Sequence, residues 1–248
     1  MTPLAENLAR LEDQIAAACH RAGRARHSVE LMAVSKTYPA ATIQEAERLG
    51  LRLFGENRVQ EFAGKAPALE PLRASGMIAA SDAPILVHLI GHLQSNKAAR
   101  AVELFDAIDS LDSLKLAERL NDAAGKLGKH LPVLLEVKLS SEETKAGLAP
   151  ESPETEDLLE RLPDLHHLDV RGLMTIAPFG VPEQETRACF RALCTWRDRW
   201  AAAHPRLKLH TLSMGMSGDF ALAIEEGSTL VRIGTALFGK RTPYVELS

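Results

Sequence analysis

The sequence is poor in cysteine and aromatic residues and lacks long runs of any one kind of side chain. Its three cysteines, Cys19, Cys189 and Cys194, show neither an even disulfide set nor metal-ligand spacing, which predicts reduced thiols in the cytoplasm. No apolar run could span a bilayer, and residues 2–6 enter a charged amphipathic pattern rather than a secretory signal. The 29 basic and 33 acidic residues are interspersed, which argues against nucleic acid or membrane as a partner.

Short apolar segments alternate regularly with amphipathic helical segments along the whole chain. Eight of the apolar segments are typical of strands, at residues 31–34, 51–55, 85–90, 104–110, 132–137, 170–176, 207–212 and 229–233. This alternation favours parallel strands joined by right-handed crossovers. Eight such units in 248 residues predict an α/β fold, a single (β/α)8 TIM barrel over residues 1–248, with residues 1–23 forming a helix that packs on the barrel.

The first of these strands ends close to a lysine. The apolar residues 31–34 are followed by Ser35, Lys36 and the turn-favouring Thr37-Tyr38-Pro39. A lysine is uncommon at the end of a buried strand because its ammonium is costly to desolvate. At the mouth of a barrel its pKa can fall, and the amine becomes a nucleophile able to form a Schiff base. The alternative is a lysine that merely extends to solvent.

Two loops at the expected carboxyl ends of the last strands predict a phosphate site, because such barrels often bind phosphate after strands seven and eight. The first loop contains Ser217 and Gly218, and we expect Ser217 to cap the following helix and leave amides at its N-terminus. In the second loop, Gly234 permits close backbone approach and Thr235 offers an amide and a hydroxyl. Each loop taken singly could instead be a turn that needs glycine.

Arg232 lies near the end of the eighth apolar segment. By strand alternation it shares its side with Gly234, so we expect it to point toward the same cavity. A guanidinium only donates hydrogen bonds, and opposite a ring nitrogen it would hold that nitrogen unprotonated. The alternative is an outward arginine that bridges to a helix.

Five dispersed segments together resemble the pyridoxal 5′-phosphate homeostasis proteins, the YggS/PROSC-type family. They are residues 33–37, 54–61, 88–97, 213–217 and 231–235, in the family's order over nearly the whole chain. The resemblance implies a barrel like the N-terminal domain of alanine racemase, with pyridoxal 5′-phosphate bound as an aldimine. The implied cofactor residues are Lys36 for the aldimine, Ser217, Gly234 and Thr235 for the phosphate, Arg232 for the pyridine nitrogen, and Asn57, Met174 and Gly218 as further cofactor-binding positions.

His92 departs from the family pattern, because many relatives have proline there. The departure leaves the conformation of its loop open but does not affect the cofactor site. Nearby, His88, Gln94, Asn96 and Lys97 form an expected polar cluster after the third strand. This cluster either caps the next helix or serves in gating or partner contact, and the sequence does not separate the two.

The resemblance predicts a cytoplasmic, monomeric protein that stores, buffers or delivers pyridoxal 5′-phosphate without robust turnover, with transient contacts to apo-enzymes that use this cofactor. One rival is an amino-acid racemase, and another is a sugar- or nucleotide-phosphate enzyme on the same barrel. Two-base racemisation needs a proton-transfer group on each face of the α-carbon. In alanine racemase-like enzymes the opposing tyrosine comes from an additional domain, which we expect this chain, ending at Ser248, to lack. Neither Tyr38 nor Tyr244 is an obvious opposing base, although Tyr244 could fold over the mouth.

Overall fold

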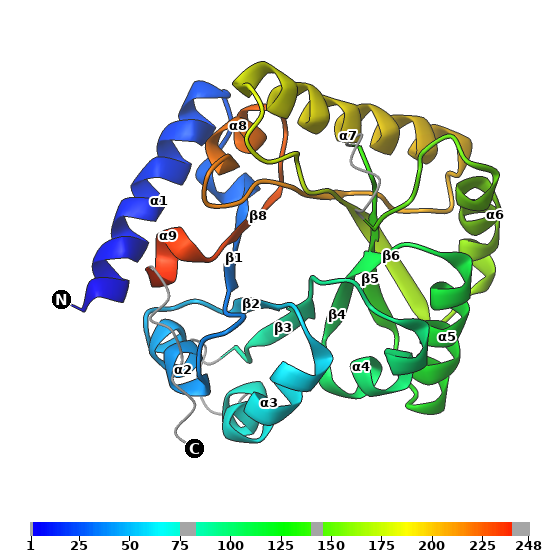
Figure 1. The fold of residues 1–248 in the computed structure, drawn as a ribbon, viewed down its shortest axis with the longest axis horizontal. Helices are drawn as coiled ribbons and strands as arrows, with labels where there is room; N and C mark the ends of the chain where they lie inside the picture. Colours follow the sequence, from blue (N-terminus) through cyan, green and yellow to red (C-terminus); the bar gives the residue numbers. More distant parts are fainter. Residues whose placement is uncertain (1, 75–82, 140–145, 240–248) are drawn as a thin grey trace.

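Eight parallel strands pair in chain order and close into a barrel, because β8 pairs with both β7 and β1. The computed structural model describes residues 2–74, 83–139 and 146–239. The strands are β1 Glu30–Val34, β2 Leu53–Glu56, β3 Leu86–Leu89, β4 Ala107–Leu111, β5 Leu131–Glu136, β6 Leu168–Met174, β7 Thr211–Ser213 and β8 Leu230–Ile233. Helices form a ring around the strands (Figure 1). The predicted (β/α)8 TIM barrel is confirmed.

The ring of helices follows the strands in sequence. The α-helices are α1 Pro3–Arg21, α2 Ala40–Arg48, α3 Val59–Ala74, α4 Ala98–Leu104, α5 Leu114–Lys126, α6 Pro153–Arg161, α7 Glu183–Ala203, α8 Phe220–Glu225 and α9 Thr235–Phe238. Short 3-10 helices lie at Arg26–Ser28, Ser95–Lys97 and Leu162–Asp164. Within the three described stretches of chain, every helix is too short or too polar to cross a membrane.

Helix α1 lies on the outside of the barrel beside α8 and α9 (Figure 1). Its start is encoded locally, because the Thr2 hydroxyl accepts the Ala5 amide and Pro3 occupies the first turn. Its apolar face is buried, and the Asn7 side-chain amide donates to the carbonyl of Leu237 in α9 at 3.0 Å. Arg24, after the helix, donates to the carbonyl of Ile224 in α8 at 2.9 Å. These contacts fix α1 over the part of the barrel that contains β8.

Several element boundaries differ from the expected ones. The fourth strand begins at Ala107 rather than residue 104, because helix α4 continues through Leu104. The seventh strand is limited to Thr211–Ser213, the residues that pair with β6 or β8, although Leu207 and Leu209 before it are buried. The second strand, expected at residues 51–55, runs from Leu53 to Glu56, and Glu56 pairs with Leu89 of β3. Residues 74–84 are small and punctuated by glycine and proline, which predicts a surface connection, and most of this segment, residues 75–82, lies outside the described residues.

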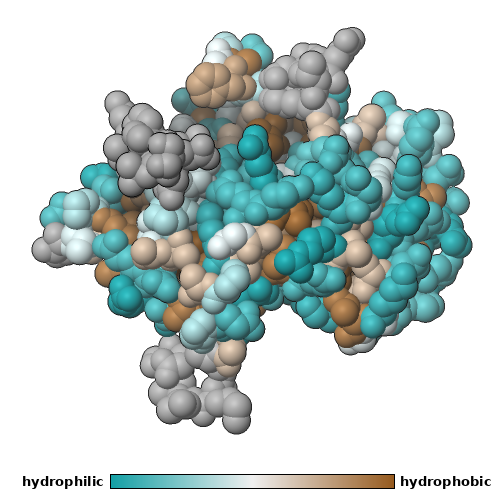
Figure 2. Space-filling view, turned by 60° about the horizontal axis from the view of Figure 1, so that its bottom comes forward, coloured by the Kyte–Doolittle hydropathy of each residue, from teal (hydrophilic) through white to brown (hydrophobic). Residues whose placement is uncertain are grey.

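The core has two parts. The larger part contains most of the buried apolar residues of the strands and helices, and a separate small cluster consists of Met32, Leu53 and Leu230 with Ile90 packed against it. Arg232 lies two residues after Leu230 on β8 and is buried as well, so side-chain alternation places a guanidinium next to this small cluster. The outer surface in Figure 2 is mostly hydrophilic, with apolar residues in small scattered groups.

Candidate functional site

A cavity of about 290 Å³ opens where the carboxyl ends of the strands meet. Its wall consists of Val34, Lys36, Tyr38, Asn57, Ile90, Ile176, Phe179, Met216, Ser217, Gly218, Asp219, Arg232, Gly234 and Thr235. The cavity therefore brings together every site residue expected from the sequence except Met174. Met174 ends β6, is fully buried and pairs with Ser213 of β7, and it does not line this cavity.

Lys36 follows β1 on a turn that a hydrogen-bond network holds in place. The Ser35 amide donates to the Gly55 carbonyl at 3.0 Å, and the Ser35 hydroxyl donates to Glu56 Oε1 at 2.7 Å. Thr37 has a φ of 70°, which is rare for a β-branched residue, and its amide donates to Glu61 at 2.5 Å. The turn is thus held on both sides of Lys36 by carboxylates.

Lys65 of helix α3 joins these two carboxylates. Its Nζ lies 2.9 Å from Glu56 Oε1 and 2.7 Å from Glu61 Oε1, and it donates to the Ser35 carbonyl at 3.2 Å. Burial raises the pKa of Glu56, and the charge of Lys65 and the hydrogen bond from Ser35 oppose that rise. Lys65 is not identifiable as part of the site from the sequence. Its only local signal is the i,i+4 spacing from Glu61, which is common on exposed helices.

Arg232 lines the cavity from β8 and is only 4% exposed. One of its terminal nitrogens donates to Ser213 Oγ at 2.7 Å, and the other donates to the Thr175 carbonyl at 2.8 Å. Burial lowers the pKa of the guanidinium, and the charges of Asp109, Glu136 and Asp219 oppose that change. Because both partners belong to the ends of β6 and β7, the alternative of an outward arginine bridging to a helix is wrong.

The two glycine-containing loops are tied to each other. The Ser217 hydroxyl accepts the amide of Ala236 at 3.2 Å, which links the loop after β7 to the start of α9. The expectation that Ser217 caps the helix following its own loop is therefore wrong. That helix, α8, begins at Phe220 after Asp219, and the Asp219 carboxylate accepts the Met216 amide at 2.6 Å. A hydroxyl that accepts this bond still has its proton to donate to a ligand.

Asn57 and the loop after β3 approach each other closely. A Cβ at Gly91 would overlap the backbone oxygen of Asn57, so glycine is required where this loop passes the cavity wall. His92, the departure from the family pattern, lies beyond this glycine and places Nδ1 3.0 Å from Asp112 Oδ2. Its ring is more than half exposed and does not line the cavity that contains Lys36.

The polar cluster expected after the third strand is divided in the structure. His88 belongs to β3, and its Nδ1 lies 3.1 Å from Oδ1 of Asp109 on β4. Burial opposes the charged form of His88, but the charge and hydrogen bond of Asp109 outweigh it and raise the pKa of the imidazole. The other expected members lie on the 3-10 helix Ser95–Lys97 and its preceding residue, where no side chain caps the helix.

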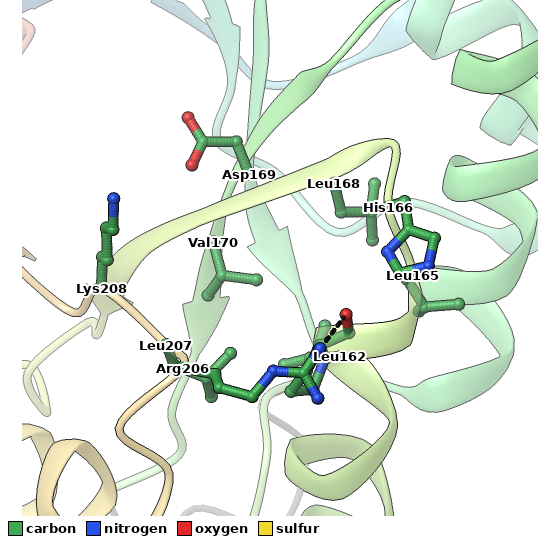
Figure 3. Close-up of a pocket in the computed structure, with 10 residues that line it drawn as sticks. Leu162, Leu165, His166, Leu168, Asp169, Val170, Arg206, Leu207 and Lys208 are labelled. Atoms are coloured by element: carbon green, nitrogen blue, oxygen red, sulfur yellow. Dashed lines mark hydrogen bonds between the residues drawn. The ribbon is translucent and has the colours of Figure 1, made fainter.

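Another hollow, of about 310 Å³, lies at the opposite end of the barrel, where β6 begins (Figure 3). Its charged side chains are exposed or half-buried, and Arg206 donates to the Pro163 carbonyl at 3.1 Å. Catalytic and binding groups of such barrels are placed at the carboxyl ends of the strands. The cavity that contains Lys36 is therefore the candidate site.

Glu136 ends β5 close to the candidate site and is only 8% exposed. Its Oε2 has no hydrogen-bond partner among the described residues. Burial, with a further contribution from the charge of Asp112, raises the pKa of Glu136 to about 7, while the charges of Arg232 and His92 oppose the rise. The ionised form is thus destabilised in the folded protein.

We expect Glu136→Gln to stabilise the protein only above acidic pH. The pKa of Glu136 in the folded protein lies above its ordinary value of 4.5, so its ionisation does not lower the free energy of unfolding below pH 4.5. Above that pH the ionised group destabilises the fold increasingly, until the pH passes about 7. The difference between these pKa values corresponds to at most about 3 kcal/mol. Urea unfolding of both proteins at pH 4.5 and pH 8 measures this difference. An equal free-energy difference at the two pH values would contradict the assignment.

The fold and the site place the chain in the class of barrels exemplified by the N-terminal domain of alanine racemase. The family model of that domain, described as "Alanine racemase, N-terminal domain", matches residues 7–242. The alanine racemase of Clostridium difficile 630 superimposes with a TM-score of 0.72 over 96% of this chain and 56% of its own, at 17% identity. At that identity the likeness shows a shared fold alone.

Within this class, the chain belongs to the family of pyridoxal phosphate homeostasis proteins. It is 41% identical to the member from Aquifex aeolicus, over 95% of this chain and 97% of that protein. It is 40% identical to the Escherichia coli K12 member, over 97% and 98% of the two chains. PipY of Synechococcus elongatus PCC7942, solved with pyridoxal phosphate bound, shares 44% identity and a TM-score of 0.82 over 95% of this chain and all of its own.

Proposed function

We propose that this protein binds pyridoxal 5′-phosphate in the cavity that contains Lys36 and serves in the homeostasis of that cofactor, by storage, buffering or delivery. The observation that carries the proposal is the convergence of Lys36, Arg232 and the two linked loops on one cavity. The relatives named pyridoxal phosphate homeostasis proteins and the PipY structure with the cofactor support it.

The residues of the cavity match the chemical groups of this cofactor. When bound, pyridoxal 5′-phosphate supplies an aldehyde that reacts with primary amines and a ring that withdraws electrons. Lys36 would hold the aldehyde carbon covalently. Ser217, through its hydroxyl proton, and the amides of Gly234 and Thr235 would donate to the phosphate, beside Gly218.

Arg232 would donate to the ring nitrogen and keep a proton off it. Its two terminal nitrogens are already bound by Ser213 and Thr175, which fixes the orientation of the guanidinium. A cation at this position disfavours a positive charge on the ring nitrogen and so weakens the electron-withdrawing power of the ring. Asn57 would line the cofactor from the loop after β2. This arrangement favours holding the cofactor over reacting it with amino acids.

Ser217→Ala is expected to weaken binding of pyridoxal 5′-phosphate by about 10- to 150-fold, because a hydrogen bond to a charged group contributes roughly 1.5 to 3 kcal/mol. Binding of unphosphorylated pyridoxal should change little. Titrations of both ligands followed by absorbance measure the two effects. Equal weakening of the two ligands would show that Ser217 acts through its bond to Ala236 and the folding of the loops.

Contacts with recipient enzymes and a monomeric state belong to the same proposal. Phe179, in the cavity wall, is 97% exposed, and Ile176 beside it is also exposed. Exposed apolar side chains at the mouth suit brief contact with an apo-enzyme that receives the cofactor. The face shown in Figure 2 has only small, scattered apolar groups, which is consistent with the proposed monomer.

We further propose that the protein does not racemise amino acids at a useful rate. Tyr38 lines the cavity, but its hydroxyl donates to the Gly239 carbonyl at 2.8 Å and its ring packs 5.0 Å from that of Phe238. It is therefore held by the start of the C-terminal segment rather than poised as an opposing base. Tyr244 lies outside the described residues.

Racemisation is tested by incubating cofactor-loaded protein with L-alanine in heavy water. We expect no sustained formation of D-alanine, because Lys36 alone can serve only one face of the α-carbon. α-Deuteration and chirality are followed together over many equivalents of substrate. Multiple-turnover formation of D-alanine that disappears in Lys36→Ala would replace the storage and delivery proposal with an enzyme.

A further inference from the structure

A cavity of about 200 Å³ adjoins the one that contains Lys36, and the two share Asn57, Ile90 and Ile176 in their walls. The other residues of its wall are Gly91, His92, Glu136, Val137, Lys138, Leu139 and Ala146. Three of these side chains, those of Val137, Leu139 and Ala146, are apolar, and His92, Glu136 and Lys138 are polar or charged. The cofactor proposed above uses the first cavity and leaves the second, which we call the Glu136 cavity, without a role.

The carboxyl group of Glu136 is the unusual feature of this wall. It is more than nine-tenths buried, and Oε2 has no hydrogen-bond partner among the described residues. Buried polar atoms in native proteins nearly always have a partner, so an unpaired carboxylate oxygen in a cavity wall calls for a donor from a ligand. The cost of leaving it unpaired is recovered when such a ligand binds.

The chemistry of the wall narrows the ligand. A carboxylate accepts hydrogen bonds and favours a positive charge, which disfavours a phosphate or another anion on this oxygen even though the cation Lys138 lies in the same wall. A bound metal ion would need several ligands, and the described residues contain no group of three or more histidine, cysteine or acidic side chains placed to hold one. A primary ammonium carries three donors and one charge, and Ile90, Val137 and Ile176 suit a short aliphatic chain attached to it.

We propose that the Glu136 cavity binds a small primary amine, with its ammonium group on the Glu136 carboxylate. The two cavities share part of their walls, so this amine would bind next to the cavity that contains Lys36. The side chain of Lys36 is itself a primary amine. The idea that this amine lies next to an amine-reactive cofactor depends on the proposed function. The binding of the amine itself does not depend on it, and it can be tested in protein that contains no cofactor.

The charges around Glu136 determine how this binding depends on pH. Asp112, which interacts with His92 at 3.0 Å, opposes ionisation of Glu136, whereas Arg232 and His92 favour it. Lys138 is the other charged residue of the cavity wall. With its pKa at about 7, Glu136 is mostly protonated at pH 6 and mostly ionised at pH 8. Alkylammonium ions stay charged over this range, so their binding should strengthen as the pH rises from 6 to 8.

The test is a titration of cofactor-free protein with n-butylammonium at pH 8, followed by NMR, with n-butanol as the neutral probe of similar shape. Glu136→Gln should weaken butylammonium binding by about tenfold or more, since a charged hydrogen bond is lost. Butanol binding should not fall in that variant. The matched control is Asp169→Asn, which removes a carboxylate from the wall of the hollow at the other end of the barrel and should change neither affinity.

Equal affinity for butylammonium in Glu136→Gln and the parent protein would overturn the proposal, and so would equal affinity of the parent for butylammonium and butanol. A Glu136→Gln variant that fails to fold is replaced by the pH series on the parent protein, where unchanged binding between pH 6 and 8 has the same meaning. Pyridoxal 5′-phosphate titrations of the same samples keep the two proposals apart, because Glu136→Gln should still bind the cofactor.

Discussion

Lys36→Ala is expected to abolish covalent attachment of pyridoxal 5′-phosphate while leaving the barrel folded. Lys36 lies on a half-buried turn after β1, and the bonds that hold the turn come from Ser35, Thr37 and Lys65. Without the amine, only the phosphate and ring contacts remain. Two or three charged hydrogen bonds of roughly 1.5 to 3 kcal/mol each leave a residual affinity of about millimolar to micromolar.

The measurement is cofactor retention through a desalting column, followed by absorbance of the protein fraction. We expect Lys36→Ala to emerge without cofactor and the parent protein to retain it. Lys138→Ala is the matched control, because this lysine lines only the neighbouring Glu136 cavity. If Lys36→Ala retained the cofactor and Lys138→Ala lost it, the cofactor would be attached in the Glu136 cavity, which would contradict the prediction.

Lys65→Met is expected to destabilise the protein by about 3 to 5 kcal/mol near neutral pH, because it leaves Glu56 buried without its cationic partner. The folded pKa of Glu56 is already raised and should rise further in this variant. Because the pKa of Glu56 is higher in the folded protein than its ordinary value of 4.5, ionisation of Glu56 does not destabilise the fold below pH 4.5 and destabilises it progressively more above that pH. The loss of stability should therefore be larger at pH 8 than at pH 5.

Urea unfolding at the two pH values measures this loss. Glu56→Gln combined with Lys65→Met should recover much of the stability, because the double variant leaves no charge buried. Glu61→Gln is the milder comparison, since Glu61 is partly exposed and its pair with Lys65 should contribute about 1 kcal/mol or less. A loss in Lys65→Met no larger than that in Glu61→Gln would show that the buried pair does not support the Lys36 turn.

The barrel and its loops were predictable because their signals are local. Each strand is a short apolar run bounded by turn residues, and the lysine and the glycine-containing loops stand at the ends of such runs. The length of β7 was not predictable, because Leu207 and Leu209 are apolar and buried but remain outside the ladder. Which buried residues pair across a barrel is determined by closure rather than by local sequence.

The hydrogen bonds and ion pairs that hold the site in place were harder to predict, because they join distant parts of the chain. The residues around Ser217 predict a helix cap, yet its hydroxyl accepts a hydrogen bond from an amide nineteen residues later, at the start of α9. Lys65 and Glu56 are unremarkable in sequence and become significant only when α3 packs over the end of β2. The sequence likewise shows Glu136 only as a charged residue at the end of a strand, and its burial is evident only in the structure.

The central claim is that Lys36 holds pyridoxal 5′-phosphate. The most direct test is to load the parent protein with the cofactor, reduce it with borohydride, digest it and locate the modified lysine by peptide mapping. We predict a pyridoxyl group on Lys36 at high occupancy, and none at that position in Lys36→Ala. An adduct located mainly on another lysine, such as Lys97 or Lys138, would contradict the account.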